Sequence, residues 1–397
     1  MKFPDDPYAP AASLARSAAM PARITAAAPP RRRWRSAITD LHRWFGLFAA
    51  LWLFGIALSG SLIAFDHELD GWLNPDLFAT SGEGPLAPLL ADAQARAGAG
   101  RIQYVVKTTD ESGLVTMGIE NGRGERSELF YDSGSGKLNG MRDADRNGLD
   151  ARAFMPTVYR LHYSFLGGET LQIFLGLVAL GWAITQLLAL AIAFTSSARW
   201  RDSFRVRAGA RGHKRNFDLH RALALWLYPV TLVLAVSGVY LNLPDPFTAA
   251  VGSVAQTDGR FDPPAATAPD VRLSMAAAAA RFDAIAAPHK VTSFSLNADA
   301  GLYRARMRDA RDISDNGQRI VWISAQDGRI VSDRHETQGP AGDQFIAWQF
   351  PLHSGRALGL PGRMLISFTG LVICTSIVTG LLIWWKKRQQ RRRVHRA

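Results

Sequence analysis

One apolar stretch with a histidine at its entry occurs twice in the chain, and this repetition limits the folds that are possible. The first copy, residues 41–66, reads LHRWFGLFAALWLFGIALSGSLIAFD, and the second, residues 219–244, reads LHRALALWLYPVTLVLAVSGVYLNLP. The two histidines, His42 and His220, each lie 17 residues before the serine of a Ser-Gly pair. The agreement indicates an internal repeat.

A second histidine motif follows each copy. YRLHYSFLGG contains His162, and FPLHSGRALGLPG contains His353, which lies 191 residues further along. Each of these histidines precedes another apolar run, at residues 171–194 and 364–385. The chain therefore consists of two copies of one unit: histidine, helix, polar region, histidine, helix.

The four apolar runs are long enough to cross a membrane. Each has about 20 residues or more, and a helix of that length spans a hydrocarbon core of about 30 Å. Tryptophans near the ends of the runs argue against buried helices of a soluble protein. The net charge is +12, and basic residues gather beside the runs, at 31–35, 199–221 and 386–396. This positive-inside pattern predicts a bacterial inner-membrane protein with both termini in the cytoplasm, two large periplasmic regions and no nucleic-acid partner.

The expected fold is a membrane α-helical four-helix bundle made of two tandem repeats, with two periplasmic α+β modules. Each polar region reads as one helix followed by strand-like runs with Gly-rich turns. Tyr131 and Trp322, which are 191 residues apart, mark equivalent strands. The expected segments are a disordered cytoplasmic leader at 1–35, spanning helix 1 at 36–66, periplasmic module 1 at 67–160, spanning helix 2 at 161–195, a basic cytoplasmic loop at 196–218, spanning helix 3 at 219–243, periplasmic module 2 at 244–351, spanning helix 4 at 352–385 and a basic cytoplasmic tail at 386–397.

This topology predicts which histidines meet. Helices 1 and 3 begin at the cytoplasmic side, so His42 and His220 share one depth; helices 2 and 4 begin at the outer side, so His162 and His353 share another. Two imidazoles that face each other between helices suit the axial positions of haem b, and we predict two haems. Histidines that only hydrogen-bond lipid or backbone are the alternative, but ionisable residues in spanning segments are functional by default. Zinc would lack ligands, with two histidines per level.

Other side chains complete the predicted sites. Arg43 and Arg221 at the cytoplasmic-side haem, and Arg356 at the periplasmic-side haem, are expected to contact propionates. His67, at the outer end of helix 1, is a rival ligand for the outer haem. Small residues beside the haem slots are expected to let the macrocycle approach the backbone, and the candidates are Gly46, Gly60, Gly167, Gly238 and Gly359. Surface positions are expected for the remaining histidines, His213, His289, His335 and His395.

Four motifs in a fixed order carry a family resemblance. They are LHRWFGL with FDHELDGWLNP, LHYSFLGG, DLHRALALW with SGVYL, and PLHSGRALG with TGLLIWWKKR. Together they resemble the PepSY-associated transmembrane family, also called iron-regulated membrane proteins, over residues 36–390. The resemblance implies PepSY folds for the outer modules. Because the family includes inner-membrane ferrisiderophore reductases of the FoxB type, it also implies a di-haem electron carrier with His42, His220, His162 and His353 as ligands.

Three functions follow as hypotheses. The first is a transmembrane ferric-siderophore reductase that takes electrons from a cytoplasmic flavoprotein reductase or a quinol and passes them to a ferric chelate held between the two modules. The chain has no P-loop and no GxGxxG between a strand and a helix, so a partner must supply the electrons. The second is a non-enzymatic scaffold whose PepSY-like modules bind a peptidase or envelope partner. The third, a metal or haem transporter, is disfavoured because the helix interiors carry few polar residues.

Overall fold

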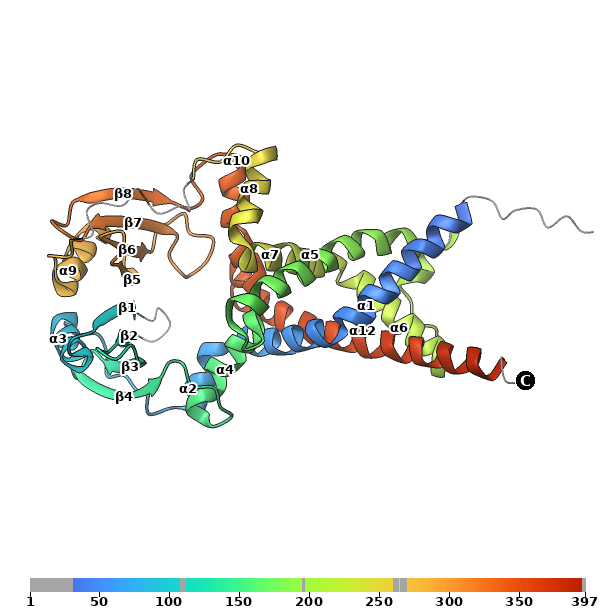
Figure 1. Cartoon of the computed structure of the whole chain (residues 1–397), viewed down its shortest axis with the longest axis horizontal. Helices are drawn as coiled ribbons and strands as arrows, with labels where there is room; N and C mark the ends of the chain where they lie inside the picture. Colours follow the sequence, from blue (N-terminus) through green and yellow to red (C-terminus); the bar gives the residue numbers. More distant parts are fainter. Residues whose placement is uncertain (1–30, 108–111, 195–196, 260–263, 265–269, 395–397) are drawn as a thin grey trace, which may run out of the picture.

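The computed structural model describes residues 31–107, 112–194, 197–259, 264 and 270–394. Long helices form a bundle, and one β-sheet domain lies at an end of it (Figure 1). The expected disordered leader at 1–35 falls mostly outside the described residues, as does His395. The first described helix, α1, already begins at Arg31.

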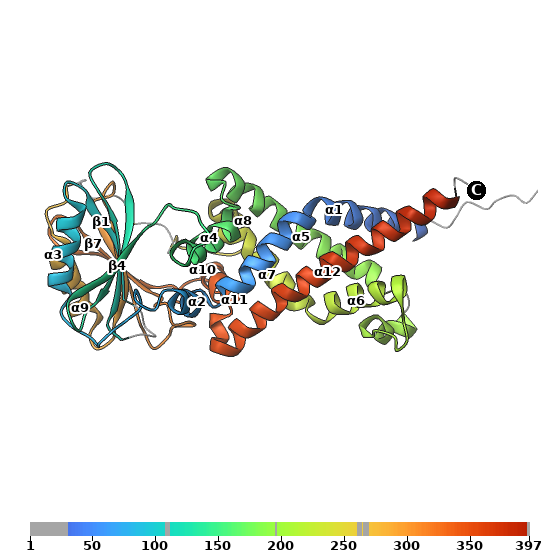
Figure 2. The ribbon, with the colours of Figure 1, turned by 90° about the horizontal axis from the view of Figure 1, so that it is seen from below.

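Among the residues that the structure describes, three helical segments are long and apolar enough to cross a membrane. They are Trp34–Ile63 within α1 (Arg31–Ile63), α5 (Gly168–Ala193), and Arg356–Val394, which joins η2 (Arg356–Leu358) to α12 (Gly359–Val394). α1 and α12 pack against each other, as both views show (Figures 1 and 2). The short η1 (Ser197–Phe204) follows α5.

The third apolar run differs from the single helix expected at residues 219–243. It forms α6 (Gly212–Trp226) and α7 (Tyr228–Asn242), which are bent by 69° relative to each other. Pro229 explains the bend, because proline lacks the amide hydrogen of the helical ladder and its ring clashes with the preceding turn. The first copy has Leu51 at the matching position, and α1 continues through it.

The outer histidines lie on helices of their own. His162 is near the end of α4 (Ala151–Ser164), and Phe165 and Leu166, with φ angles of 47° and 64°, turn the chain into α5. Spanning helix 2, expected at 161–195, is therefore interrupted just after its histidine. His353 lies on the short α11 (Gln349–Ser354), which follows α10 (Ala341–Ala347).

The two polar regions share one antiparallel sheet. Its eight strands have the order β4-β3-β2-β1-β5-β6-β7-β8, so the two expected modules are halves of a single sheet domain. The halves join where β1 pairs with β5, at Tyr104–Ser295, Val105–Phe294 and Val106–Ser293. The strands are β1 (Arg101–Lys107), β2 (Leu114–Glu120), β3 (Arg126–Asp132), β4 (Lys137–Asp143), β5 (Val291–Asn297), β6 (Leu302–Met307), β7 (Arg319–Ser324) and β8 (Ile330–His335).

Two helices, α3 (Leu86–Ala97) and α9 (Met275–Ala286), cover the face of the sheet that points away from the bundle (Figure 2). The apolar core lies beneath them and includes Tyr131 and Ile323. Because side chains alternate between faces, Trp322 points to the other face, toward the bundle. Trp322 therefore corresponds to Phe130 rather than to Tyr131, and the expected equivalence is wrong by one residue.

Short elements connect the sheet domain to the bundle. α2 (Asp66–Leu73) follows α1, and α8 (Pro244–Val254) follows α7. At the end of β8, His335 is buried, although a surface position is expected for it from the sequence. His335 is 1% exposed, and its Nε2 lies 3.0 Å from Oδ1 of Asp312. The carboxylate partner explains how this ring is accommodated inside the protein.

The core predicts a large effect for one substitution. Phe282 of α9 is fully buried, and its ring centre lies 6.1 Å from that of Phe294 on β5. Phe282→Ala is expected to destabilise the sheet domain by about 3–5 kcal/mol, because it leaves a cavity under the helix. Thermal unfolding of the purified protein would measure the loss. The neighbouring change Asp283→Ala removes only a surface ion pair with Lys107 and should cost less than about 1 kcal/mol.

Candidate functional site

The structure brings the four histidines together in the two pairs that the topology predicts. His42 of α1 faces His220 of α6, with ring centres 6.2 Å apart and planes at 61°. His162 of α4 faces His353 of α11, with ring centres 6.1 Å apart and planes at 64°. We call these the inner pair and the outer pair, the outer one being nearer the sheet domain. The two arrangements are nearly the same, although they come from different helices.

Serines of the repeated Ser-Gly motif orient the outer pair. The Oγ of Ser59 lies 3.3 Å from Nδ1 of His162, and this Nδ1 also lies 2.9 Å from the carbonyl oxygen of Ile56. In the second copy, the Oγ of Ser237 lies 2.8 Å from Nδ1 of His353. A proton on Nδ1 of His162, donated to the carbonyl, leaves its Nε2 as a free lone pair for a metal. The serine 17 residues after each inner histidine thus serves the outer histidine of the same copy.

The inner pair is oriented less symmetrically. Nδ1 of His220 donates to the carbonyl oxygen of Ser376 on α12, at 2.8 Å. Nδ1 of His42 is buried and has no hydrogen-bond partner among the described residues. In both pairs Nε2 makes no hydrogen bond within the described part of the chain, so each ring keeps one nitrogen available.

Two glycines lie directly against the histidine rings. A Cβ at Gly60 would come within 2.8 Å of Cε1 of His162, and one at Gly380 within 3.1 Å of Cε1 of His220. Gly60 was expected beside a haem slot, whereas Gly380, in the Thr-Gly pair near the end of α12, was not. Gly46, one turn after His42, is exposed, and beyond its own helix backbone and chain neighbours no atom lies within 4 Å of its Cβ position. That space beside the inner pair is compatible with a bulky planar ligand.

The predicted arginines have different surroundings. Arg43 and Arg221 directly follow the inner histidines, and the Nε atom of each is buried without a partner among the described residues. These are donors that an anionic group at the inner pair would satisfy. The outer ends of both guanidinium groups are engaged, since Nη2 of Arg43 lies 3.0 Å from Asp40 and Nη2 of Arg221 donates to the carbonyl oxygen of Asp202 at 2.9 Å. Arg356, near the outer pair, is engaged as well. Its Nη1 lies 3.0 Å from Asp315, and its Nη2 lies 4.0 Å from Asp66.

The geometry of both pairs fits a metal held between two imidazoles. Metal–imidazole bonds are about 2 Å long, and two of them with the ring radii added account for a centre-to-centre distance of about 6 Å. Nδ1 atoms oriented at three of the four rings, Nε2 atoms without hydrogen bonds, and the unpartnered Nε atoms of Arg43 and Arg221 agree with bis-histidine haem b. Within the described ranges no group of three or more His, Cys, Asp or Glu side chains could hold a metal ion. A tetrahedral zinc site would therefore lack protein ligands here.

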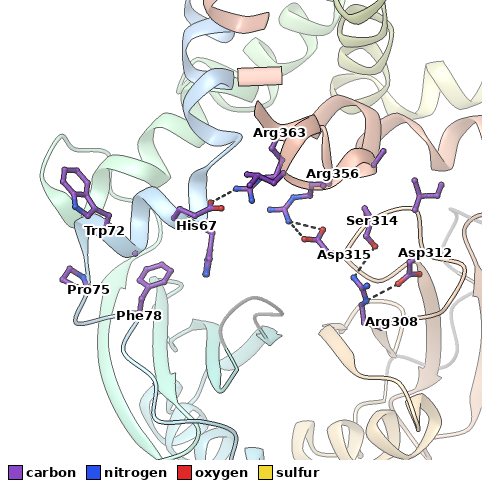
Figure 3. Close-up of a pocket in the computed structure, with 16 residues that line it drawn as sticks. His67, Trp72, Pro75, Phe78, Arg308, Asp312, Ser314, Asp315, Arg356 and Arg363 are labelled. Atoms are coloured by element: carbon purple, nitrogen blue, oxygen red, sulfur yellow. Dashed lines mark hydrogen bonds and ion pairs between the residues drawn. The ribbon is translucent and has the colours of Figure 1, made fainter. Parts of the chain in front are cut away.

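A pocket of about 1000 Å³ lies between the sheet domain and the bundle (Figure 3). Its walls come from α2, from the loop between β6 and β7, and from the start of α12. Arginines and carboxylates alternate around it: Arg363 pairs with Glu68 at 2.6 Å, and Arg356 pairs with Asp315. His67, the rival outer ligand, lies in this wall with its ring against Phe78, at 5.1 Å between centres. The outer pair itself is formed by His162 and His353.

A second cavity, of about 500 Å³, lies on the other side of the His67–Phe78 contact. It separates the first half of the sheet from α4 and is lined by Tyr104, Tyr159 and Tyr163 among others. Tyr159 is three residues before His162, and burial raises the pKa of its phenol, with nearby Asp66 adding to the shift. This second cavity reaches the helix that carries His162 from the sheet side.

Comparison with known proteins identifies the family to which a chain with these helices and paired histidines belongs. A family model described as the PepSY-associated TM region matches residues 39–387, a range that contains both histidine pairs. A search of curated proteins found no match. Because the family model covers most of the chain, including the helices, the sheet and the four paired histidines, the chain belongs to the PepSY-associated transmembrane family.

Proposed function

We propose that this protein is an inner-membrane electron carrier with two haem b groups, and that it reduces ferric chelates such as ferrisiderophores on the periplasmic side. The observation that supports this most strongly is the pair of matched histidine sites, 6.2 Å and 6.1 Å between ring centres. Haem bound at such sites supplies one-electron chemistry. The protein would then conduct electrons across the membrane rather than move a solute.

The inner pair is the entry point in this proposal. His42 and His220 would ligate the haem, and Arg43 and Arg221 would hold its propionates. The electron donor would be a cytoplasmic flavoprotein reductase or a membrane quinol. α1 links the two levels, because Ser59 follows His42 by 17 residues, a rise of about 25 Å.

The outer pair is the exit point. The pocket of about 1000 Å³ is at the upper end of the range usual for small-molecule sites, and its mixture of arginine and carboxylate side chains suits a polar chelate. One electron converts the chelated Fe(III) to Fe(II). Hard oxygen ligands hold Fe(II) more weakly than Fe(III), so the metal leaves and the chelator is released unchanged.

The transporter hypothesis receives less support. Several hydroxyl groups buried in the spanning helices bond to carbonyl oxygens of their own helix, as Thr185 does to Gly181 and Thr379 to Thr375, each at 2.9 Å, whereas Oγ1 of Thr369 is buried without a partner among the described residues. The bonded hydroxyl groups are satisfied locally and offer little to a moving ion. The scaffold hypothesis predicts a protein without haem. A measurement of haem content therefore separates it from the electron-transfer hypothesis.

That experiment is an optical spectrum of the detergent-purified protein, oxidised and then reduced with dithionite, with haem quantified per chain. Reduced b-type bands and about two haems per chain are expected. Oxidation of the reduced protein by an added ferric chelate, with Fe(II) trapped by a colorimetric chelator, would test the second step. A colourless protein from cells with ample haem would contradict the proposal and favour the scaffold.

The serine beside the outer pair gives a finer prediction. Ser237→Ala removes the hydroxyl that lies against Nδ1 of His353 and should weaken retention of the outer haem by about 10–100-fold, as is usual for partners of metal-ligating histidines. Transfer of haem to an excess of apomyoglobin would measure this. The control Ser253→Ala alters an exposed serine that bonds to the carbonyl of Ala250, and its haem should leave at the original rate. Equal rates in both variants would contradict the role of Ser237.

A further inference from the structure

Arg304 is a half-buried arginine without a charge partner. It lies on β6 between Tyr303 and Ala305, which are buried in the core on the opposite face of the strand. Alternation therefore directs Arg304 toward the bundle. Its guanidinium lies over the ring of Trp322, 5.7 Å from the ring centre. It makes no hydrogen bond or ion pair with the described residues, and its Nε is buried.

The neighbouring acid is already engaged. Glu336 accepts from Nη2 of Arg306 at 2.8 Å through one oxygen and from Nε2 of Gln318 at 3.3 Å through the other. Arg306 also donates to the carbonyl of Gly317 at 3.0 Å. Glu336 makes no hydrogen bond or ion pair with Arg304, although its charge acts on the guanidinium from a distance, and Arg306 adds a second positive charge beside Arg304. Burial and this neighbouring charge lower the pKa of Arg304 to about 10, so it remains charged at neutral pH.

The first half of the sheet shows how such a charge is normally balanced. There Arg142 lies over the ring of Phe130, at 4.9 Å, and pairs with both Asp70 and Glu128 at 2.7 Å. Phe130 is the counterpart of Trp322, so the two arginines lie over equivalent aromatic rings. Arg142 has two carboxylates and Arg304 has none. A half-buried charge without a partner is unfavourable, which points to an anion supplied from outside the chain.

The position of Arg304 relates it to the outer pair. Tyr240 of α7 is close enough that the charges of Arg304, Arg306 and Glu336 all act on its phenol. Tyr240 lies one helical turn beyond Ser237, whose hydroxyl lies against His353. Arg304 therefore extends from the sheet toward the end of α7 that carries the support of the outer pair.

We propose that Arg304 binds a carboxylate at the junction of the sheet domain and the bundle. The planar fork of a guanidinium matches a carboxylate in two parallel hydrogen bonds, and the guanidinium of Arg304 makes no hydrogen bond with the described residues. Two sources offer this group: a propionate of a haem at the outer pair, which rests on the proposed function, or a carboxylate of a soluble chelate bound at the same junction. Arg356, the arginine expected at the outer haem, already has Asp315 as a partner.

The test compares the full-length wild type with Arg304→Gln, which removes the charge, and Arg304→Lys, which keeps the charge but loses the fork. The matched control is Arg334→Gln, an exposed arginine on the next-but-one strand, β8. Haem per chain, the midpoint potential of each haem and the thermal unfolding temperature are measured for each. Binding of gallium(III) citrate, a redox-inert carboxylate chelate, is measured by equilibrium dialysis beside a gallium trihydroxamate that has no carboxylate.

If the carboxylate is a haem propionate, Arg304→Gln should lower the midpoint potential of the outer haem alone, because loss of a nearby positive charge favours the ferric form. Citrate binding should then be unchanged. A soluble source predicts at least about tenfold weaker citrate binding, unchanged trihydroxamate binding and unchanged potentials. For Arg304→Lys, the affected quantity, whether the outer potential or citrate binding, should lie between the values of the wild type and of Arg304→Gln. Potentials and citrate binding that both match those of Arg334→Gln would overturn the proposal, even if the unfolding temperature changes. A wild type without haem would refute the proposed function alone, and the dialysis would still test Arg304.

Discussion

Replacing either histidine of the inner pair by alanine is expected to lower the haem content from about two to about one per chain. In His220→Ala the remaining His42 cannot hold the iron from both sides, while His162 and His353 keep their partners on α1 and α7. Conversely, His353→Ala should remove the outer haem and leave the inner one. Ferric-chelate reduction should be lost in both variants, because each interrupts the proposed path. Pyridine haemochrome analysis and Fe(II) trapping would measure the two effects.

The control for these variants is His289→Ala, which changes an exposed histidine of the sheet domain. It should retain both haems and full activity. Loss of both haems from each single variant, with the fold intact by circular dichroism, would show that the two sites are not independent. Retention of two haems in His220→Ala would remove that histidine from the ligand set.

Gly362→Val is expected to dislodge the outer pair although it changes no ligand. A Cβ at Gly362 would lie 2.1 Å from the carbonyl oxygen of Gly355, two residues after His353, and backbone cannot give way as a flexible side chain can. Either α12 or the turn after α11 must move, and His353 moves with that turn. The expected result is a protein that retains the inner haem, loses the outer one and no longer reduces ferric chelates.

The matched change is Gly252→Val in α8, where a Cβ would make only an ordinary 3.4 Å contact with Oγ1 of Thr257. It should keep both haems. Electron paramagnetic resonance would distinguish the two low-spin haems in each variant. An unchanged outer haem in Gly362→Val would mean that His353 is positioned independently of the contact between Gly355 and Gly362.

The pairing of the histidines could be predicted because it depends on topology alone. A repeated motif fixes which residues are equivalent, and the direction of each spanning helix fixes their depth. Neither argument needs the exact path of the backbone. The prediction therefore holds even though His162 and His353 lie on separate helices, α4 and α11, rather than within the spanning helices.

Other features needed information that a repeat does not contain. The bend at Pro229 has a local signal, but the apolar pattern of its run is the same as that of the unbroken α1, and that pattern favours one continuous helix. The one-residue error between Tyr131 and Trp322 arose because a fixed offset ignores insertions, and a shift of one residue in a strand exchanges the two faces. The pairing of β1 with β5 has no local signal.

The functional residues that sequence reasoning missed share one property, which is that their importance lies in contacts with distant parts of the chain. Gly380 matters because His220 lies against it, and Arg304 because it forms no ion pair with a carboxylate of the described residues. Ser59 and Ser237 were visible as a repeated motif, but their partners are 103 and 116 residues away in sequence. A spacing rule finds such residues without revealing what they touch.

The joint between β1 and β5 also sets the order in which the protein can be assembled. Val105 pairs with Phe294, which is 189 residues later, so at a synthesis rate of about 5–20 residues per second the first half of the sheet waits roughly 10–40 s for its neighbour. During that time β1 is an open edge, which is a template for wrong pairing. Lys107 at the end of this strand places a charge there, a common protection of strand edges. The nascent chain must therefore stay soluble as half a sheet until α5 and the bent pair α6–α7, which lie between the two halves in sequence, have been synthesised.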